Sequence, residues 1–131
     1  IYTTEWNERT YDACLEQALE RLYRGVRVIV DASFREAARR RRFLEAGVAA
    51  GVDVAFLECR ATDETVRARL ERRQGGVSDA DWASHRAAAE AWEADEVDDP
   101  RWTSFPIPTD EGLDQTLGAA QRALESLGLA E

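Results

Sequence analysis

The sequence contains no lysine and no methionine among its 131 residues, so all 17 of its basic residues are arginines. A single histidine and two cysteines argue against a zinc site, because structural zinc takes four clustered cysteine or histidine ligands. Cys14 and Cys59 each fall on an apolar stripe, and we expect them to be small core residues in a reducing, cytoplasmic compartment. No apolar run approaches the roughly 20 residues of a membrane-spanning helix. The absence of methionine, with a helical pattern starting almost at the first residue, suggests a piece of a longer chain.

The charge balance is acidic. Twenty-six aspartates and glutamates give a net charge of −9, which argues against nucleic-acid binding because such binding depends on a basic surface. The composition, 44% hydrophobic and 33% charged, is that of a soluble globular protein. The length is that of one ordinary domain, and we expect a single domain over residues 1–131.

Short apolar segments predict three β-strands, over residues 26–31, 53–59 and 103–108. The first two are apolar on both faces, whereas two prolines favour an edge position for the third. Helical periodicity surrounds them, over residues 4–25, 35–50, 62–74, 78–96 and from 110 onward. This alternation predicts an α/β fold with a parallel sheet covered on both faces.

Asp31 ends the first predicted strand. Right-handed crossovers bring the carboxyl ends of parallel strands to one edge, where open α/β sheets bind their ligands. A carboxylate there can hold Mg²⁺ or take a proton from an attacking hydroxyl. The alternative is a turn or capping aspartate before the next helix. The sequence leaves both open.

Arginines cluster just before the pair Gly75 and Gly76, at Arg67, Arg69, Arg72 and Arg73. Arginine offers fixed, bidentate donors for phosphate oxygens, and the glycines would let the following segment move. This pattern predicts a lid over residues 67–96 that excludes water from a bound nucleotide. The alternative is a solvated helix face whose arginines pair with neighbouring glutamates.

A second run of arginines follows Asp31. Arg35, Arg39 and Arg42 can share one helix face and could hold an anionic acceptor. Such arginines could equally form a solvent-exposed face. The single histidine, His85, lies in the middle of a predicted helix, and we expect it at the surface.

Four stretches together carry a resemblance to a known family: GVRVIVDASF from residue 25, LEC from residue 57, RARLERR from residue 67 and SDA from residue 78. With them the chain resembles the P-loop kinase-like group of AAA family ATPases and predicted kinases, related to gluconate, shikimate and zeta-toxin-type kinases. The resemblance covers nearly the whole chain. It implies an ATP-dependent kinase that uses ATP and Mg²⁺ and phosphorylates a small-molecule acceptor.

The resemblance also implies roles for particular residues. Asp31 would be the Walker-B-like aspartate, near Mg²⁺ or the acceptor hydroxyl. Arg69 and Arg73 would be lid arginines that grip the ATP phosphates. Thr109 and Asp110 would lie where such kinases approach the adenine. For the acceptor, Arg35 would be a candidate contact, together with Arg39.

One departure from the family pattern is serious. The phosphate-binding loop G-x-x-x-x-G-K-[ST] is absent from these residues, because there is no lysine. Without it there is no backbone amide nest for the β-phosphate and no lysine for the γ-phosphate. The sequence therefore predicts that this chain alone is inactive and corresponds to the carboxyl-terminal part of a kinase.

The same departure affects the sheet. The fold class implied is a three-layer parallel sheet of the P-loop NTPase type, incomplete here, with strands 3, 4 and 5 of a 2-3-1-4-5 order. The gap would expose apolar edges, which are prone to pairing. Either the remaining strands close up, or the central strand comes from an N-terminal segment or from another chain. Two alternatives stay open: a non-catalytic kinase-like interaction domain, and a polynucleotide-type kinase whose arginines 39–42 grip a phosphate backbone.

Overall fold

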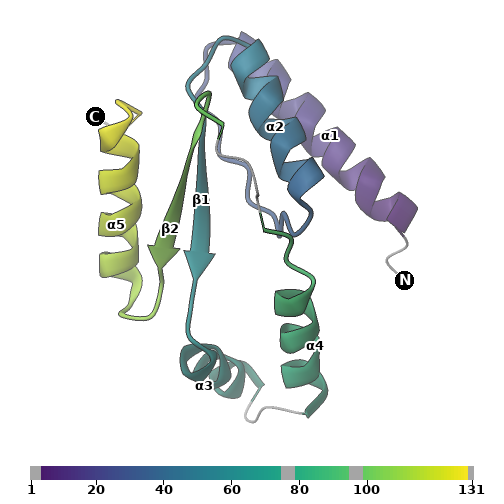
Figure 1. Ribbon diagram of the computed structural model, residues 1–131, viewed down its shortest axis with the longest axis vertical. Helices are drawn as coiled ribbons and strands as arrows, with labels where there is room; N and C mark the ends of the chain where they lie inside the picture. The colour runs from purple at the N-terminus through teal and green to yellow at the C-terminus, as the bar shows by residue number, and fades with distance from the viewer. Residues whose placement is uncertain (1–3, 75–78, 95–98, 130–131) are drawn as a thin grey trace. The chain divides into compact units, whose positions relative to one another are not determined.

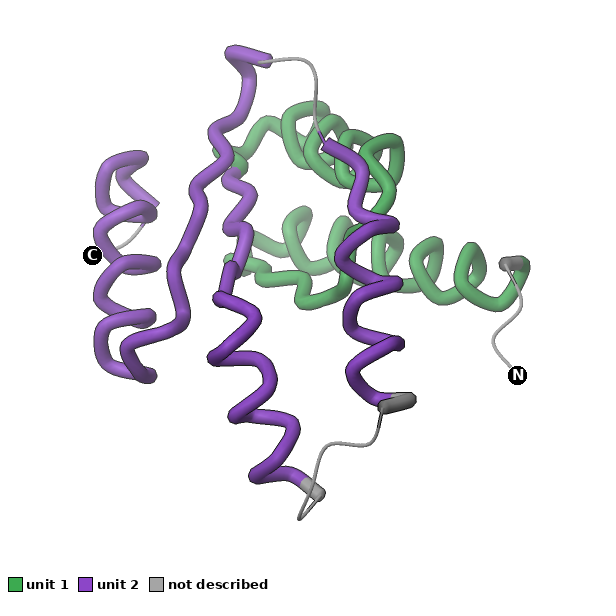
Figure 2. Tube along the Cα trace, turned by 60° about the horizontal axis from the view of Figure 1, so that its bottom comes forward, with its two compact units in different colours: residues 1–54 green, residues 55–131 purple. Residues whose placement is uncertain are grey.

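A computed structural model describes residues 4–74, 79–94 and 99–129 of the chain. By their internal contacts, the residues form two compact units, 1–54 and 55–131 (Figure 2). The first unit contains two helices, α1 (Thr4–Tyr23) and α2 (Ala37–Ala49). The second contains, in order, β1 (Ala55–Arg60), α3 (Asp63–Gln74), α4 (Asp79–Glu90), β2 (Thr103–Pro108) and α5 (Leu113–Ser126) (Figure 1).

Both helices of the first unit end where glycines predict it. Gly25 has φ +76° and its N–H bonds to the Leu22 carbonyl at 2.9 Å, while Gly51 closes α2 with φ +75°. Glycine adopts this left-handed conformation without the penalty that a side chain imposes. The helices predicted over residues 4–25 and 35–50 are therefore confirmed, with ends shifted by a few residues.

The core of the first unit is a small aromatic cluster between α1 and α2. The Phe34 ring lies 5.0 Å from Phe43 and 5.5 Å from Tyr11, measured between centroids. Phe34, Ala18 and Leu44 are each less than one-tenth exposed. Tilted and edge-to-face aromatic contacts of this kind stabilise beyond the area they bury.

The strand predicted over residues 26–31 is wrong: the segment forms neither a helix nor a strand. Val26 is 48% exposed and Ile29 is 91% exposed. A strand exists only where a neighbour completes its hydrogen bonds, and within the described residues this segment has no ladder partner. The apolar composition predicts burial that the described residues do not provide.

The other two predicted strands are confirmed. β1 and β2 pair in parallel, in a register that runs from Ala55 opposite Thr103 to Arg60 opposite Pro108. Helix α5 packs beside β2, where Ile107 is only 3% exposed (Figure 1). The fold is thus α/β with a small parallel sheet, and the described residues contain two of the three expected strands.

Some expected core residues are exposed. Cys14 and Cys59 are both exposed free thiols, so their prediction as core residues is wrong. The apolar residues Leu113 and Leu117 of the last helix are 71% and 56% exposed. Two strands offer α5 only a narrow surface, so it buries part of its apolar stripe. Among the described helices, none combines the length and apolarity that crossing a membrane would require.

Candidate functional site

The candidate site lies at the edge where β1 and β2 end. Because the strands are parallel, both arrowheads point the same way, toward α3 (Figure 1). The chain leaves β1 at Arg60 and enters α3 at Asp63, while it leaves β2 at Pro108 and continues into Thr109 and Asp110. Parallel pairing therefore brings the residues after β2 to the start of the arginine-bearing helix.

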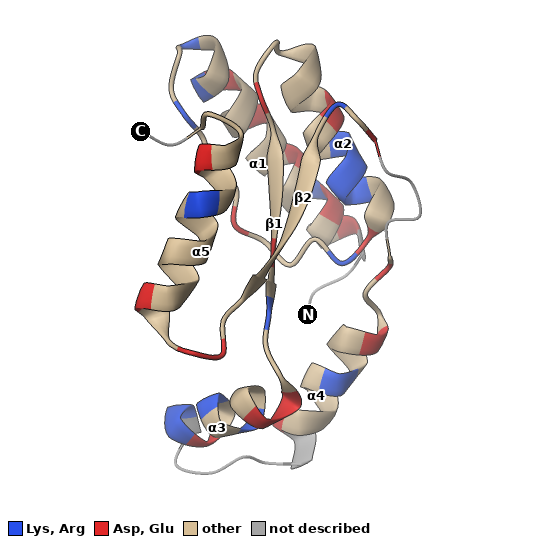
Figure 3. Cartoon of the chain, turned by 60° about the vertical axis from the view of Figure 1, so that its left-hand side comes forward, with Lys and Arg blue, Asp and Glu red and all other residues tan. Residues whose placement is uncertain are grey.

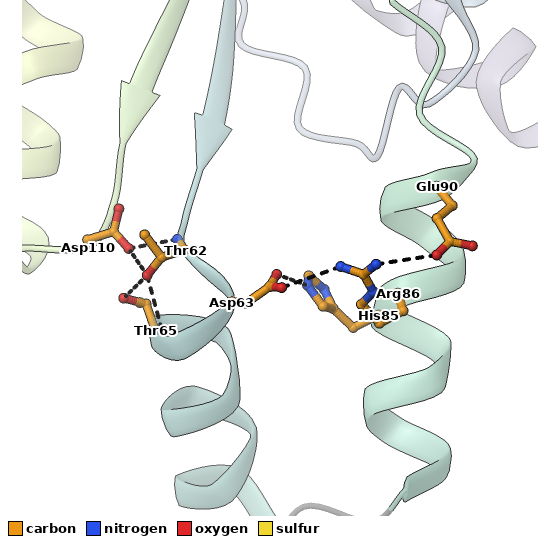
Figure 4. A network of polar contacts seen from close by, with 7 residues as sticks. All are labelled: Thr62, Asp63, Thr65, His85, Arg86, Glu90 and Asp110. Atoms are coloured by element: carbon orange, nitrogen blue, oxygen red, sulfur yellow. Dashed lines mark hydrogen bonds and ion pairs between the residues drawn. The ribbon is translucent and has the colours of Figure 1, made fainter.

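Asp110 is bound to the start of α3 (Figure 4). Its Oδ1 accepts the Thr62 backbone N–H at 2.8 Å and the Thr62 hydroxyl at 2.9 Å. The Thr62 Oγ1 in turn accepts the Thr65 backbone N–H at 3.3 Å, which makes Thr62 the N-cap of α3. The Asp110 carboxylate thus joins the end of β2 to the N-cap of α3.

Arg69 is bound to the other residue after β2. Its guanidinium donates to the Thr109 hydroxyl at 3.1 Å and to the Thr109 carbonyl. Thr109 is fixed from the opposite side, because its N–H and hydroxyl donate to the Arg60 carbonyl at 2.8 and 3.0 Å. Three of the four residues predicted to bind nucleotide, Arg69, Thr109 and Asp110, are therefore brought together.

Arg73 lies in the last turn of α3 and is exposed. Figure 3 shows the basic residues of α3, in blue, gathered along the helix. A guanidinium on an exposed helix face can turn toward an anionic ligand, although nothing in the geometry fixes that direction. The role of Arg73 stays a prediction.

The hydrogen bonds of Asp110 predict its titration. The Thr62 backbone N–H, followed by the hydroxyls of Thr65 and Thr62, holds the pKa of the Asp110 carboxyl below its usual value. Because the folded pKa lies below the unfolded one, this stabilisation is present above the unfolded pKa and is lost as the pH falls through the folded pKa. We expect carbon-13 NMR to give an Asp110 midpoint below about 3.9, the usual aspartate value.

The matched variant for this titration is Thr62→Val, which removes the hydroxyl and keeps the backbone N–H. The Asp110 midpoint should then rise part of the way toward the usual value. A midpoint at or above the usual value in the unmodified protein would show that these bonds do not form in solution.

The start of α3 is also paired with α4. Asp63 lies 3.9 Å from His85 Nε2 and 3.4 Å from Arg86, which also reaches Glu90 at 3.5 Å (Figure 4). Further along α3, the Arg67 guanidinium lies 4.1 Å from the centroid of the Trp82 ring. His85 is therefore partly covered rather than fully at the surface. The predicted hinge at Gly75 and Gly76 lies outside the described residues.

In the first unit, Asp31 and Arg35 are exposed. Arg39 is different: its side chain is only 9% exposed, pairs with Glu8 and Glu36, and lies 4.2 Å above the Tyr11 ring. These contacts join α2 to α1. The acceptor contacts proposed for Arg35 and Arg39 stay predictions, and for Arg39 an acceptor would have to compete with two glutamates.

The candidate residues are divided between the units. Asp31, Arg35 and Arg39 belong to residues 1–54, whereas Arg69, Arg73, Thr109 and Asp110 belong to residues 55–131. Their convergence on one ligand stays a prediction. A groove of about 520 Å³ beside Asp110 follows α5. Its wall carries the carboxylates of Asp110, Glu111 and Asp114 and one arginine, so its net negative charge would repel a polyphosphate.

The residues present fit a nucleotide with Mg²⁺ only in part. Across the described residues, no three cysteine, histidine or acidic side chains form a metal-binding group. Mg²⁺, however, commonly takes one or two protein carboxylates and completes its shell with water and phosphate oxygens, so the exposed Asp31 suffices chemically. The arginines of α3 suit phosphate, while the lysine of a phosphate-binding loop is absent from the sequence.

Sequence reasoning assigned no role to Thr65, and it assigned Arg40 a role only within the run 39–42 of the polynucleotide-kinase alternative. Thr65 completes the polar network at the start of α3, and the pattern T-x-x-T at residues 62–65 could have indicated it. Arg40 is the most deeply buried side chain described, at 2% exposure. Within a run of four arginines no sequence signal singles it out.

Comparison with known proteins supports the expected family. No curated protein and no solved structure gives a significant match. The model of the family described as AAA domain matches residues 1–94, more than half of the chain. P-loop domains of this kind generally bind nucleotide and Mg²⁺. The chain therefore belongs to the AAA domain family of nucleotide-binding P-loop NTPases.

Proposed function

We propose that this chain is part of an ATP-dependent kinase that phosphorylates a small molecule. The observation that carries the proposal is the contact of Arg69 with Thr109, at the carboxyl edge of parallel strands, in a chain of a nucleotide-binding family. That edge is where α/β sheets bind nucleotides. An arginine already at the edge needs only to exchange its Thr109 partner for a phosphate oxygen.

Different residues of the chain would have different roles in phosphoryl transfer. Arg69 and Arg73 would neutralise the negative charge that develops on the phosphates, and the segment of Thr109 would border the base. Asp31 would orient the acceptor hydroxyl or ligate the metal, and Arg35 would contact the acceptor. Mg²⁺, when bound, would add positive charge to the phosphate oxygens.

The proposal requires a component outside residues 1–131. A phosphate-binding loop containing Gly-Lys would come from another segment or another chain. Its strand would lie between residues 26–31 and β1, which gives the strand order 2-3-1-4-5. The 91% exposure of Ile29 supports this, because an apolar segment with no neighbour would gain both hydrogen bonds and burial from an added strand.

Calorimetric titration with Mg²⁺–ATP tests the proposal. We expect the 131-residue chain to bind with a Kd weaker than about 1 mM, and the protein that carries the Gly-Lys loop to bind at least about tenfold more tightly, in the range usual for enzyme substrates. Equal affinity in both would contradict the need for the loop. Lack of binding in both would contradict the kinase proposal.

A second candidate is a non-catalytic kinase-like domain that associates with other proteins. The exposed apolar side chains Ile29, Leu113 and Leu117 favour it, because exposed apolar surface often marks an interface. The same titration separates the candidates. Lack of ATP binding by the complete protein would favour the interaction domain.

A further inference from the structure

The turn that follows Asp31 has an uncommon backbone conformation. Phe34 has φ +43°, the one positive φ found at a non-glycine position within the described residues. A left-handed conformation is disfavoured for a residue with a Cβ, because the Cβ comes too close to the following carbonyl oxygen. It persists only when the surroundings hold it, and such positions are common at functional sites.

Two groups from the flanking helices hold this turn. The Phe34 N–H donates to the Tyr11 hydroxyl of α1 at 3.2 Å, and that hydroxyl lies 3.1 Å from Ser33 Oγ. From α2, Arg40 Nη1 donates to the Phe34 carbonyl at 2.7 Å and to the Arg35 carbonyl at 3.0 Å. Both the amide and the carbonyl of the strained residue are therefore bonded.

Arg40 has an unusual position for an arginine, since it is only 2% exposed. Burying a guanidinium is costly unless its donors are satisfied. Here two bonds from one nitrogen go to consecutive carbonyls of the same turn. The neighbouring Arg41, in contrast, is exposed. The buried charge therefore acts on the backbone at Phe34 and Arg35.

The turn lies close to the candidate chemistry along the chain. Phe34 comes three residues after Asp31 and directly before Arg35. Since an extended residue spans at most about 3.6 Å, Asp31 lies within roughly 11 Å of Phe34. A fixed backbone at Phe34 restricts where both neighbouring side chains can reach.

We propose that Arg40 is a positioning residue: through the Phe34 turn, it holds Asp31 and Arg35 in place for phosphoryl transfer. This inference rests on the proposed kinase function. Arg40 would touch neither nucleotide nor acceptor. Its removal should therefore affect turnover through Asp31 and leave nucleotide affinity intact.

The test uses the protein that carries the Gly-Lys loop, with Mg²⁺–ATP as the probe and phosphate release as the measured rate. Arg40→Met should lower kcat at least about tenfold and change the Kd for ATP less than about threefold, a pattern that separates the chemical step from binding. Arg40→Lys should give an intermediate kcat. Arg41→Met, which removes an exposed neighbouring arginine, should leave both constants unchanged. Urea denaturation curves identify a temperature at which all variants stay folded, and the kinetic constants are compared at that temperature.

A double-mutant cycle separates positioning from a general loss of structure. In an Asp31→Asn background, Arg40→Met should lower kcat less than about twofold, because the group it positions has already been removed. An equal loss in both backgrounds, or an equal loss of ATP affinity, would overturn the proposal.

Amide hydrogen exchange measures the effect of Arg40 on the Phe34 turn separately from the kinase function. If the complete protein neither binds nor hydrolyses ATP, the kinase function fails and the positioning role fails with it. Hydrogen exchange still measures whether Arg40 restrains the turn. Arg40→Met should speed exchange at the Phe34 amide about tenfold and leave the exchange rates in the middle of α1 unchanged. Unchanged exchange at Phe34 would overturn the proposal even in an active enzyme.

Discussion

Replacing Asp31 with asparagine is expected to lower kcat for phosphate release from Mg²⁺–ATP by about 100-fold or more, in the protein that carries the Gly-Lys loop. Asparagine keeps the size of the side chain but can neither accept the proton of an attacking hydroxyl nor supply an anionic ligand. The Kd for ATP should change less than about threefold, because the main nucleotide contacts lie elsewhere. Steady-state kinetics and calorimetry measure the two constants.

Asp53→Asn is the matched control, because Asp53 is another exposed aspartate of the first unit and precedes β1. It removes the same charge and should leave kcat within about twofold, as is usual for surface substitutions. If Asp31→Asn reduces kcat and ATP affinity by the same factor, Asp31 contributes to binding rather than to transfer, and its proposed role is wrong.

Replacing Arg69 or Arg73 with alanine is expected to weaken Mg²⁺–ATP binding about tenfold each, since a charge-assisted hydrogen bond contributes about 1.5–3 kcal/mol. The double variant should lose about 100-fold or more if the two contacts are independent. Calorimetric titration of the protein that carries the Gly-Lys loop measures the loss of affinity in the single and the double variants.

Arg122→Ala controls for net charge, because Arg122 is an exposed arginine of the same unit on α5. It changes the charge by the same amount and should leave the Kd within about twofold. A comparable loss for Arg122→Ala would indicate that the arginines act only through the overall field of the protein. Full affinity in the double variant would exclude Arg69 and Arg73 from the phosphate site.

Local signals predicted much of the fold. Apolar periodicity placed the five described helices, although α4 ends at Glu90, earlier than the predicted residue 96, and glycines follow the ends of α1 and α2. Parallel pairing of β1 and β2 followed from the alternation of strands and helices. That pairing also explains why Thr109 and Asp110, which the resemblance implied as nucleotide-site residues, lie beside Arg69 and the start of α3.

What the sequence could not predict depends on neighbours. Residues 26–31 have the composition of a buried strand, but a strand requires a partner, and the described residues contain none for it. The same holds for Cys14, Leu113 and Leu117, whose apolar stripes exceed the surface available to cover them. Each misprediction assumed a larger core than these two units provide.

The contacts of Arg39 and Arg40 show a second limit of prediction from the sequence. Arg39 and Arg40 are adjacent in a run of four arginines, yet one pairs with glutamates and the other is buried against backbone carbonyls. Successive helix residues project about 100° apart around the axis, so the two side chains meet different neighbours. Arg40 faces the turn at Phe34, whose φ is positive. Aromatic residues rarely adopt that conformation, so composition and periodicity give no indication of it.

The central proposal is that Asp31 and Arg69 both act on one bound nucleotide. A crystal structure of the complete protein with a non-hydrolysable ATP analogue and Mg²⁺ tests it most directly. The account predicts the Arg69 guanidinium within hydrogen-bonding distance of a phosphate oxygen, and the Asp31 carboxylate at the metal or beside the γ-phosphate. A nucleotide bound elsewhere, or Asp31 and Arg69 on opposite sides of the molecule with the phosphates contacting neither, would contradict it.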